Sequence, residues 1–111
     1  MILRKIALAC TALALTGTVL ADDGKTLYQD HCRKCHGTEG NARTARGYLY
    51  FARDFTRPAW QAERSDEELF RIISNGPGWW STMPAYRKRL SEEERRALVK
   101  VVRDFGKTAA P

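Results

Sequence analysis

Two cysteines and a histidine stand together in the sequence as Cys32-Arg33-Lys34-Cys35-His36. Cysteines at this spacing can each form a thioether with one of the two vinyl groups of a haem, and the histidine that follows is carried under the iron. The motif therefore predicts one haem c, covalently attached through Cys32 and Cys35, with His36 as an axial iron ligand.

Three other uses of these residues have to be weighed. A disulfide between Cys32 and Cys35 would leave His36 as a chance neighbour. A thioredoxin-like pair should lie near a strand–helix–strand pattern, which the surrounding sequence lacks. A structural zinc site usually takes its four ligands from two separated pairs, whereas every cysteine and histidine beyond residue 21 lies within residues 31–36. Haem attachment is therefore favoured over a disulfide or another metal site.

The second axial ligand is predicted to be Met83, the only methionine of the chain besides Met1. It is followed by Pro84, whose ring restricts the backbone. A thioether sulfur suits haem iron, and ligation by one histidine and one methionine raises the reduction potential. A methionine alone is more often core filler than a ligand, but the haem motif upstream favours ligation here.

His31 is the competing candidate for the second ligand. It is adjacent to Cys32 in the sequence, so its side chain starts on the same side of the haem as His36 and would have to reach round the macrocycle. We interpret His31 as a polar residue on the first helix.

Residues 1–21 have the pattern of a secretory signal peptide. Two basic residues precede an almost wholly apolar run over 6–20, and small residues precede a predicted cleavage site after Ala21. The apolar run is shorter than the roughly 20 residues that span a bilayer, so association with a membrane is expected only if this leader is uncleaved. We predict one exported domain, residues 22–111, in the periplasm, where bacterial haem c is attached.

The charges exclude one class of partner. The chain has 19 Lys and Arg against 13 Asp and Glu, a formal charge of +6. Positive and negative residues are interspersed, whereas nucleic-acid binding needs a concentrated basic patch. We expect a monomer whose partners are redox proteins and not nucleic acid.

Helical patterns predict an all-α fold. Asp22 or Asp23 can cap a first helix that runs into the haem motif, and Ser65 and Ser91 each begin a capping box. The box at Ser65 opens a helix that ends at Asn75-Gly76-Pro77-Gly78, and the box at Ser91 opens a last helix with Gly106 as its stop. We expect three to five helices joined by long loops around one haem, with no sheet.

Residues 37–64 are predicted to form a long loop. They include four aromatic residues, Tyr48, Tyr50, Phe51 and Phe55, and so long a loop in a small domain needs something to organise it. The aromatic side chains can shield a haem edge from water or form a small satellite core, and both alternatives stay open.

Together these features resemble the class I cytochromes c, which are small monohaem electron carriers. The resemblance covers nearly all of residues 22–111 and rests on Gly24, Tyr28, the haem motif, Met83-Pro84 and a last helix with Val102 and Phe105. It implies that Gly24 and Tyr28 on the first helix pack against Val102 and Phe105. A frayed helix end at Gly24 is the alternative. The sequence departs from the family in one respect, since the family usually has a proline shortly after the haem histidine, whose carbonyl accepts the other imidazole N–H. Here the first proline after His36 is Pro58, so Pro58 or a non-proline carbonyl must take this role.

The predicted function is electron transfer, with the iron cycling between ferric and ferrous. Trp60, Trp79 and Trp80 are candidates to donate indole N–H bonds to haem propionates or simply to pack in the core. A basic rim of Arg33, Lys34 and Arg87–Arg89 could steer the protein to acidic partners, or be an ordinary solvated face. The alternative functions are a haem sensor or small haem enzyme with a labile distal ligand, and a dedicated cytochrome subunit.

Overall fold

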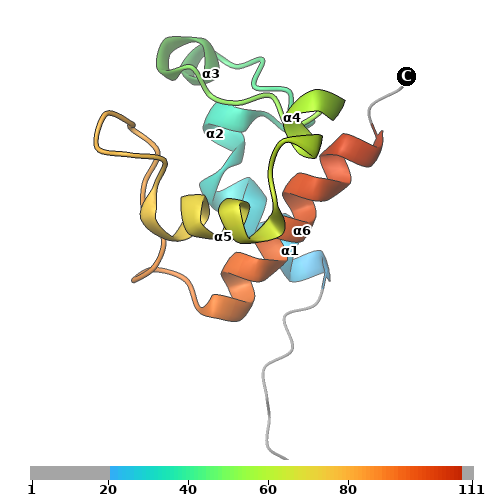
Figure 1. Ribbon diagram of the computed structural model, residues 1–111. Coiled ribbons are helices and arrows are strands. Elements are labelled where there is room, and N and C mark those ends of the chain that lie inside the picture. Colours follow the sequence, from blue (N-terminus) through green and yellow to red (C-terminus); the bar gives the residue numbers. More distant parts are fainter. Residues whose placement is uncertain (1–20, 109–111) are drawn as a thin grey trace, which may run out of the picture.

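The computed structural model describes residues 21–108, which form helices and no strand (Figure 1). Of the predicted leader, residues 1–21, all but Ala21 lie outside the described residues. Among the helices of residues 21–108, none combines the length and the apolar character that a membrane span requires. The described helices are α1 (Ala21–His31), α2 (Arg33–His36), α3 (Ala45–Tyr50), α4 (Pro58–Ala62), α5 (Asp66–Asn75) and α6 (Glu92–Thr108).

Helices α1 and α6 pack against each other and form the centre of the fold (Figure 1). Gly24 allows the close approach, because a Cβ there would lie 3.2 Å from the Ala97 carbonyl oxygen and 3.3 Å from Val101 Cγ2. The rings of Tyr28 and Phe105 are 4.9 Å apart. The predicted packing of the first helix on the last is therefore confirmed, and the atoms nearest to Gly24 belong to Ala97 and Val101.

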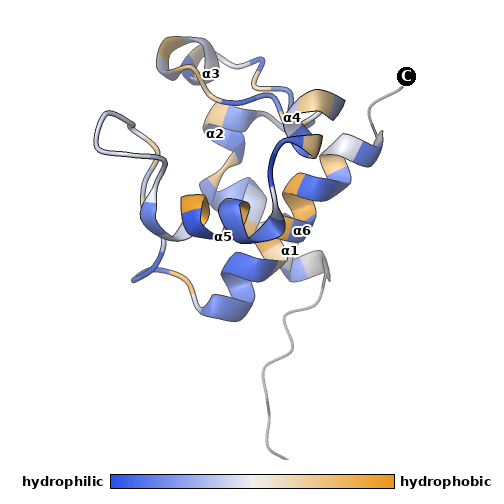
Figure 2. Ribbon diagram, in the orientation of Figure 1, coloured by the Kyte–Doolittle hydropathy of each residue, from blue (hydrophilic) through white to orange (hydrophobic). Residues whose placement is uncertain are grey.

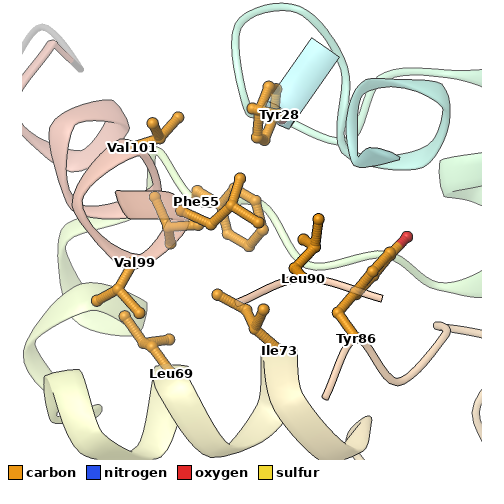
Figure 3. Close-up of a cluster of buried hydrophobic side chains, with 10 residues drawn as sticks. Tyr28, Phe55, Leu69, Ile73, Tyr86, Leu90, Val99 and Val101 are labelled. Atoms are coloured by element: carbon orange, nitrogen blue, oxygen red, sulfur yellow. The ribbon is translucent and has the colours of Figure 1, made fainter. Parts of the chain in front are cut away.

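Helix α5 covers the other side of α6 and completes the core. Figure 2 shows apolar residues gathered where α5, α6 and α1 meet. In Figure 3, Leu69 of α5 and Val99 of α6 point toward one another, and Ile73 lies beside Leu90. Burial of these side chains removes apolar surface from water, which is the main favourable term in folding. Phe55, from the segment between α3 and α4, lies in the same cluster.

The helix ends follow the predicted caps with three exceptions. In the second box, the Glu94 amide donates to Ser91 Oγ at 3.1 Å and the Ser91 amide donates to Glu94 Oε1 at 3.0 Å. Helix α5 ends at Gly76, with a φ of 77° that favours glycine. However, α1 already begins at Ala21, so neither aspartate caps it, and a turn at Cys32 separates it from α2. Helix α6 also continues through Gly106 to Thr108.

The prediction of a loop over residues 37–64 is wrong in part, because α3 and α4 lie within it. Thr44 begins α3 by accepting a hydrogen bond from the Gly47 amide on its side-chain oxygen, at 2.8 Å. Pro58 occupies the first position of α4, where a missing N–H costs nothing. Both helices are too short to show a period of apolar residues. Helices α3 and α4, together with the break at Cys32 that separates α1 from α2, raise the number of described helices above the expected three to five.

Candidate haem site

The haem motif (residues 32–36) lies where α1 ends and α2 begins. The Cys32 amide donates to the Tyr28 carbonyl at 2.8 Å, and the His36 amide donates to the Cys32 carbonyl at 3.0 Å, so the motif keeps helical bonding across the turn. Cys32 and Cys35 are both free and half-buried, so the disulfide alternative is not formed. Burial, with a smaller contribution from Cys35, raises the pKa of the Cys32 thiol to about 12. This thiol is therefore neutral until it reacts.

The imidazole of His36 is held in one orientation by two neighbours. Its Nδ1 lies 3.0 Å from the Arg53 carbonyl oxygen, which can only accept, so Nδ1 carries the proton. Its ring stacks on Phe55, with centroids 4.3 Å apart and planes 18° from parallel. Burial lowers the pKa of His36, and the bond to Arg53 offsets part of this effect. The result is a neutral imidazole whose Nε2 could bind a metal.

The carbonyl that orients His36 therefore belongs to Arg53 and not to Pro58. This residue could not be identified from the sequence, because a main-chain oxygen is present at every position whatever the residue type. The short helix α3 begins after Thr44 and brings the chain back past the motif, so that Gly47 lies against the Cys35 carbonyl and the Arg53 carbonyl reaches His36. A non-proline carbonyl thus takes the place of the usual proline.

Two residues that the sequence analysis did not single out attach α3 to the motif. Thr44 Oγ1 donates to the Cys35 carbonyl oxygen at 2.8 Å while accepting from the Gly47 amide. A Cβ at Gly47 would lie 2.3 Å from the Ala42 carbonyl oxygen and 2.6 Å from that of Cys35. Only glycine therefore fits where α3 crosses the motif. The helix start Thr-x-x-Gly was the available signal, but it is weak alone.

Met83 lies on the methionine loop (residues 76–91), which joins α5 to α6. Its side chain is partly buried against the core cluster, as is Cys32 of the motif. Its amide donates to Ser81 Oγ at 3.1 Å. Tyr86 of the same loop is buried and its hydroxyl donates to the His31 carbonyl at 3.2 Å, which fastens the loop to the end of α1. The structure thus brings the predicted second ligand and the motif to the same core.

The competing ligand His31 lies elsewhere. Its side chain is exposed, and its ring lies edge-on to that of Tyr86 with centroids 5.4 Å apart. This placement agrees with a polar residue on α1. No group of three or more histidine, cysteine or acidic side chains in residues 21–108 could hold a separate metal ion.

The three tryptophans have different surroundings. Trp60 lies against Phe55, with ring centroids 5.2 Å apart, and its Nε1–H is buried without a hydrogen-bond partner. A buried donor without an acceptor costs free energy, and an ionised propionate would be a suitable acceptor. Trp79 and Trp80 are 94% and 70% exposed. Trp60 is therefore the one of the three that fits a haem carboxylate.

The aromatic cluster of the 37–64 segment divides into buried and exposed members. Phe55 belongs to the main core, while Tyr48, Tyr50 and Phe51 of α3 and its end are exposed. The satellite core is therefore not formed. Shielding of a haem edge by these residues stays a prediction.

The side chains of the predicted basic rim, Arg33, Lys34 and Arg87–Arg89, are all exposed. Arg87 Nε donates to Asn75 Oδ1 at 2.9 Å, and the guanidinium of Arg89 lies 5.8 Å from the centroid of the Tyr86 ring. No ion pair within residues 21–108 involves these rim residues, so their charges face solvent uncompensated.

Comparison with known proteins assigns this arrangement to a family. The family described as cytochrome c oxidase, cbb3-type, subunit III matches residues 19–100. Among curated proteins, the Cbb3-type cytochrome c oxidase subunit CcoP of Azospirillum brasilense is 30% identical over 91 residues, which cover 82% of this chain and 30% of the relative. The chain thus spans less than a third of that relative's length.

Solved structures agree with the family match. The KustC0563 c-type cytochrome is 41% identical, with a TM-score of 0.68, and the match covers 74% of this chain and 95% of that chain. A single-residue mutant of the same protein matches with the same identity and TM-score over 75% of this chain and 98% of its own.

Proposed function

The chain belongs to the family of the cbb3-type cytochrome c oxidase subunit III, and from that premise we propose that it carries single electrons in the periplasm with His36 and Met83 as axial haem ligands. The predictions of a class I c-type cytochrome, an all-α cytochrome fold and covalently bound haem c are confirmed. Cys32 and Cys35 stand in the attachment positions. The proposal concerns the ligands, the compartment and the partners.

The observation that carries the proposal is the arrangement of His36. Its Nδ1–H donates to a main-chain oxygen and its burial keeps the ring neutral, which leaves Nε2 available to the iron. Such a hydrogen bond on the other ring nitrogen fixes the tautomer and raises the basicity of the ligand. The stack on Phe55 restricts rotation of the ring.

Met83 is the proposed second ligand because it combines a soft donor with a restrained backbone. It lies against the same core as Cys32, and its loop is tied to α1 through Tyr86. Bound haem c supplies one-electron exchange between the ferric and ferrous states. With both axial positions taken by the chain, no coordination site is left for a substrate, which favours an electron carrier over an enzyme or gas sensor.

The surroundings supply the remaining requirements of a carrier. The unpaired Nε1–H of Trp60 is suited to hold a propionate. The exposed basic rim, Arg33, Lys34 and Arg87–Arg89, is suited to steer encounters with acidic partner surfaces. Redox encounters of this kind are small and transient.

A second candidate, a dedicated subunit of an oxidase complex, is favoured by the relative's name. The matched protein is a subunit of a cbb3-type cytochrome c oxidase, although this chain spans only 30% of it. A general shuttle would be isolated alone as a monomer, whereas a subunit would co-purify with one oxidoreductase in stoichiometric amount. Affinity purification of the tagged chain from its native cells under mild conditions separates the two.

The ligation is tested by visible spectra of the haem-loaded protein, recorded oxidised, reduced, and reduced with carbon monoxide. We expect a low-spin six-coordinate spectrum that is insensitive to carbon monoxide. Met83→Ala should give a high-spin ferric spectrum and bind carbon monoxide readily, while the matched control His31→Ala should leave the spectrum unchanged. Carbon monoxide binding by the wild-type protein would contradict the proposal and favour a haem sensor or small haem enzyme.

A further inference from the structure

Arg95 on α6 is the only charged side chain that is buried among the described residues, with 8% of its surface exposed. Burial of a guanidinium is costly unless its donors find partners. No ion pair within residues 21–108 joins Arg95 to a carboxylate. Its burial therefore depends on neutral partners, and their positions indicate its role.

The partners of Arg95 lie at the two ends of the methionine loop. Its Nη1 donates to Ser74 Oγ at 2.6 Å, in the last turn of α5, and Ser74 is 1% exposed. Its Nε donates to the Ser91 carbonyl oxygen at 3.3 Å, directly before α6 begins. The guanidinium carbon also lies 4.9 Å from the centroid of the Phe70 ring on α5. One side chain thus joins the last turn of α5, which precedes the loop, to Ser91, which ends the loop.

The same region closes the base of the loop through main-chain bonds. The Tyr86 amide donates to the Ile73 carbonyl at 3.0 Å, and the Arg87 amide donates to the Ser74 carbonyl at 2.9 Å. Ser74 therefore bonds Arg95 through its hydroxyl and the returning chain through its carbonyl. A shift of Ser74 would move the carbonyl on which this closure depends.

We propose that Arg95 is the positioning residue of the methionine loop, which holds the base of the loop closed and so keeps Met83 in place. The consequence for iron ligation rests on the proposed role of Met83. The closure of the loop base by Arg95, which we call the clamp, does not rest on the role of Met83, because it concerns contacts within the chain alone.

Arg96 provides a matched control on the same helix. Its guanidinium carbon also lies over the Phe70 ring, at 3.9 Å, but its ion pairs are with Glu67 at 2.8 Å and Glu92 at 3.5 Å. These contacts join α5 to α6 at the surface and do not reach the base of the loop. Replacement of Arg96 removes a charge and a ring contact without removing the clamp.

The test is amide hydrogen exchange, followed by NMR on the haem-loaded protein, for the Tyr86 and Arg87 amides. In Arg95→Met we expect these two amides to exchange about tenfold faster or more, because Ser74 loses a buried partner, while the Leu98 and Val99 amides in the core of α6 change much less. Arg96→Met should leave all four nearly unchanged. Ser74→Ala removes only the hydrogen bond between Arg95 and Ser74, and it should also accelerate exchange of the Tyr86 and Arg87 amides. It replaces Arg95→Met as the test variant if Arg95→Met fails to fold.

A second readout is the rate at which imidazole binds the ferric protein, since it must displace the distal ligand. We expect this rate to rise about tenfold or more in Arg95→Met and hardly at all in Arg96→Met. Arg95→Lys keeps the charge but reaches fewer partners, so it should give an intermediate rate.

Equal acceleration of all four amides, or none, would overturn the clamp. If Met83→Ala leaves the wild-type spectrum unchanged, the proposed ligation fails instead, and the exchange of the Tyr86 and Arg87 amides still decides the role of Arg95.

Discussion

The two sides of the proposed haem site, with His36 on the proximal side and Met83 on the distal side, are built differently. On the proximal side, His36 is partly buried, stacks on the core residue Phe55 and is bonded to the Arg53 carbonyl, so it is held by contacts with the folded core. On the distal side, Met83 belongs to a loop without helix, and its own amide bonds only within that loop. Disturbance of the proximal side should therefore cost global stability, whereas disturbance of the distal side should mainly alter access to the iron.

The largest expected effect is on the proximal side, from Phe55→Ala. The change removes a buried ring that contacts His36, Trp60 and Phe105, so we expect the free energy of unfolding to fall by about 3–5 kcal/mol. Guanidinium denaturation of the haem-loaded protein measures this. Leu49→Ala, at a position that is 65% exposed, is the control and should change stability by less than about 0.5 kcal/mol. Similar losses in both variants would contradict a core role for Phe55.

A smaller proximal effect is expected from Gly47→Ala. The added Cβ would lie 2.3 Å from the Ala42 carbonyl oxygen and 2.6 Å from that of Cys35, so α3 must move away from the haem motif. We expect a loss of about 1–3 kcal/mol in the free energy of unfolding. We also expect a changed NMR shift of the His36 ring, since Arg53 follows α3. An unchanged ring signal would mean that α3 does not set the position of the Arg53 carbonyl.

On the distal side, Gly76→Ala should act on the iron more than on the fold. Gly76 has a φ of 77°, and a Cβ there would lie 3.3 Å from the Met83 carbonyl oxygen. We expect a loss of about 1–2 kcal/mol in stability from the left-handed backbone together with faster imidazole binding. If stability falls and the binding rate stays the same, the two sides do not differ as described.

The smallest effect is a pH dependence that involves Tyr28. Burial raises the pKa of this hydroxyl above its ordinary value of 10.0, and it donates to the Gly37 carbonyl at 2.6 Å. Because the folded state holds this proton more tightly than the unfolded state, the Tyr28 hydroxyl contributes fully to the free energy of unfolding below pH 10. This contribution is lost as the pH rises further. The free energy of unfolding, measured from pH 8 upward, should therefore fall less steeply above pH 10 in Tyr28→Phe. If the free energies of unfolding of the wild-type protein and Tyr28→Phe fall in parallel above pH 10, Tyr28 does not contribute to the pH dependence of stability.

The proximal and distal sides also differ in how well the sequence predicts them. The haem motif, the cap at Ser65 and the capping box at Ser91 depend on residue types at fixed spacings, and the structure places them as predicted. The pairing of Tyr28 with Phe105, which the resemblance to the class I cytochromes c implied, is also present. Met83 could be singled out because it is the only methionine of the sequence besides Met1. Its part in ligation stays a prediction.

Other features were missed because their determinants are not local residue types. The carbonyl of Arg53 acts through the path of the main chain, and the burial of Arg95 depends on where α5 and α6 meet. In the sequence, Arg95 is one of several charged residues at the start of the last helix. Helices α3 and α4 have too few residues to show a period.

The bond from His36 to the Arg53 carbonyl has a consequence for how the protein can change. A main-chain oxygen is present whatever side chain occupies position 53, so substitutions there leave the acceptor in place. Insertions or deletions between residues 37 and 53 would instead move it. If His36 binds the iron as proposed, variation in length, more than variation in residue type, is therefore how this segment can adjust the electron density that the imidazole gives to the iron.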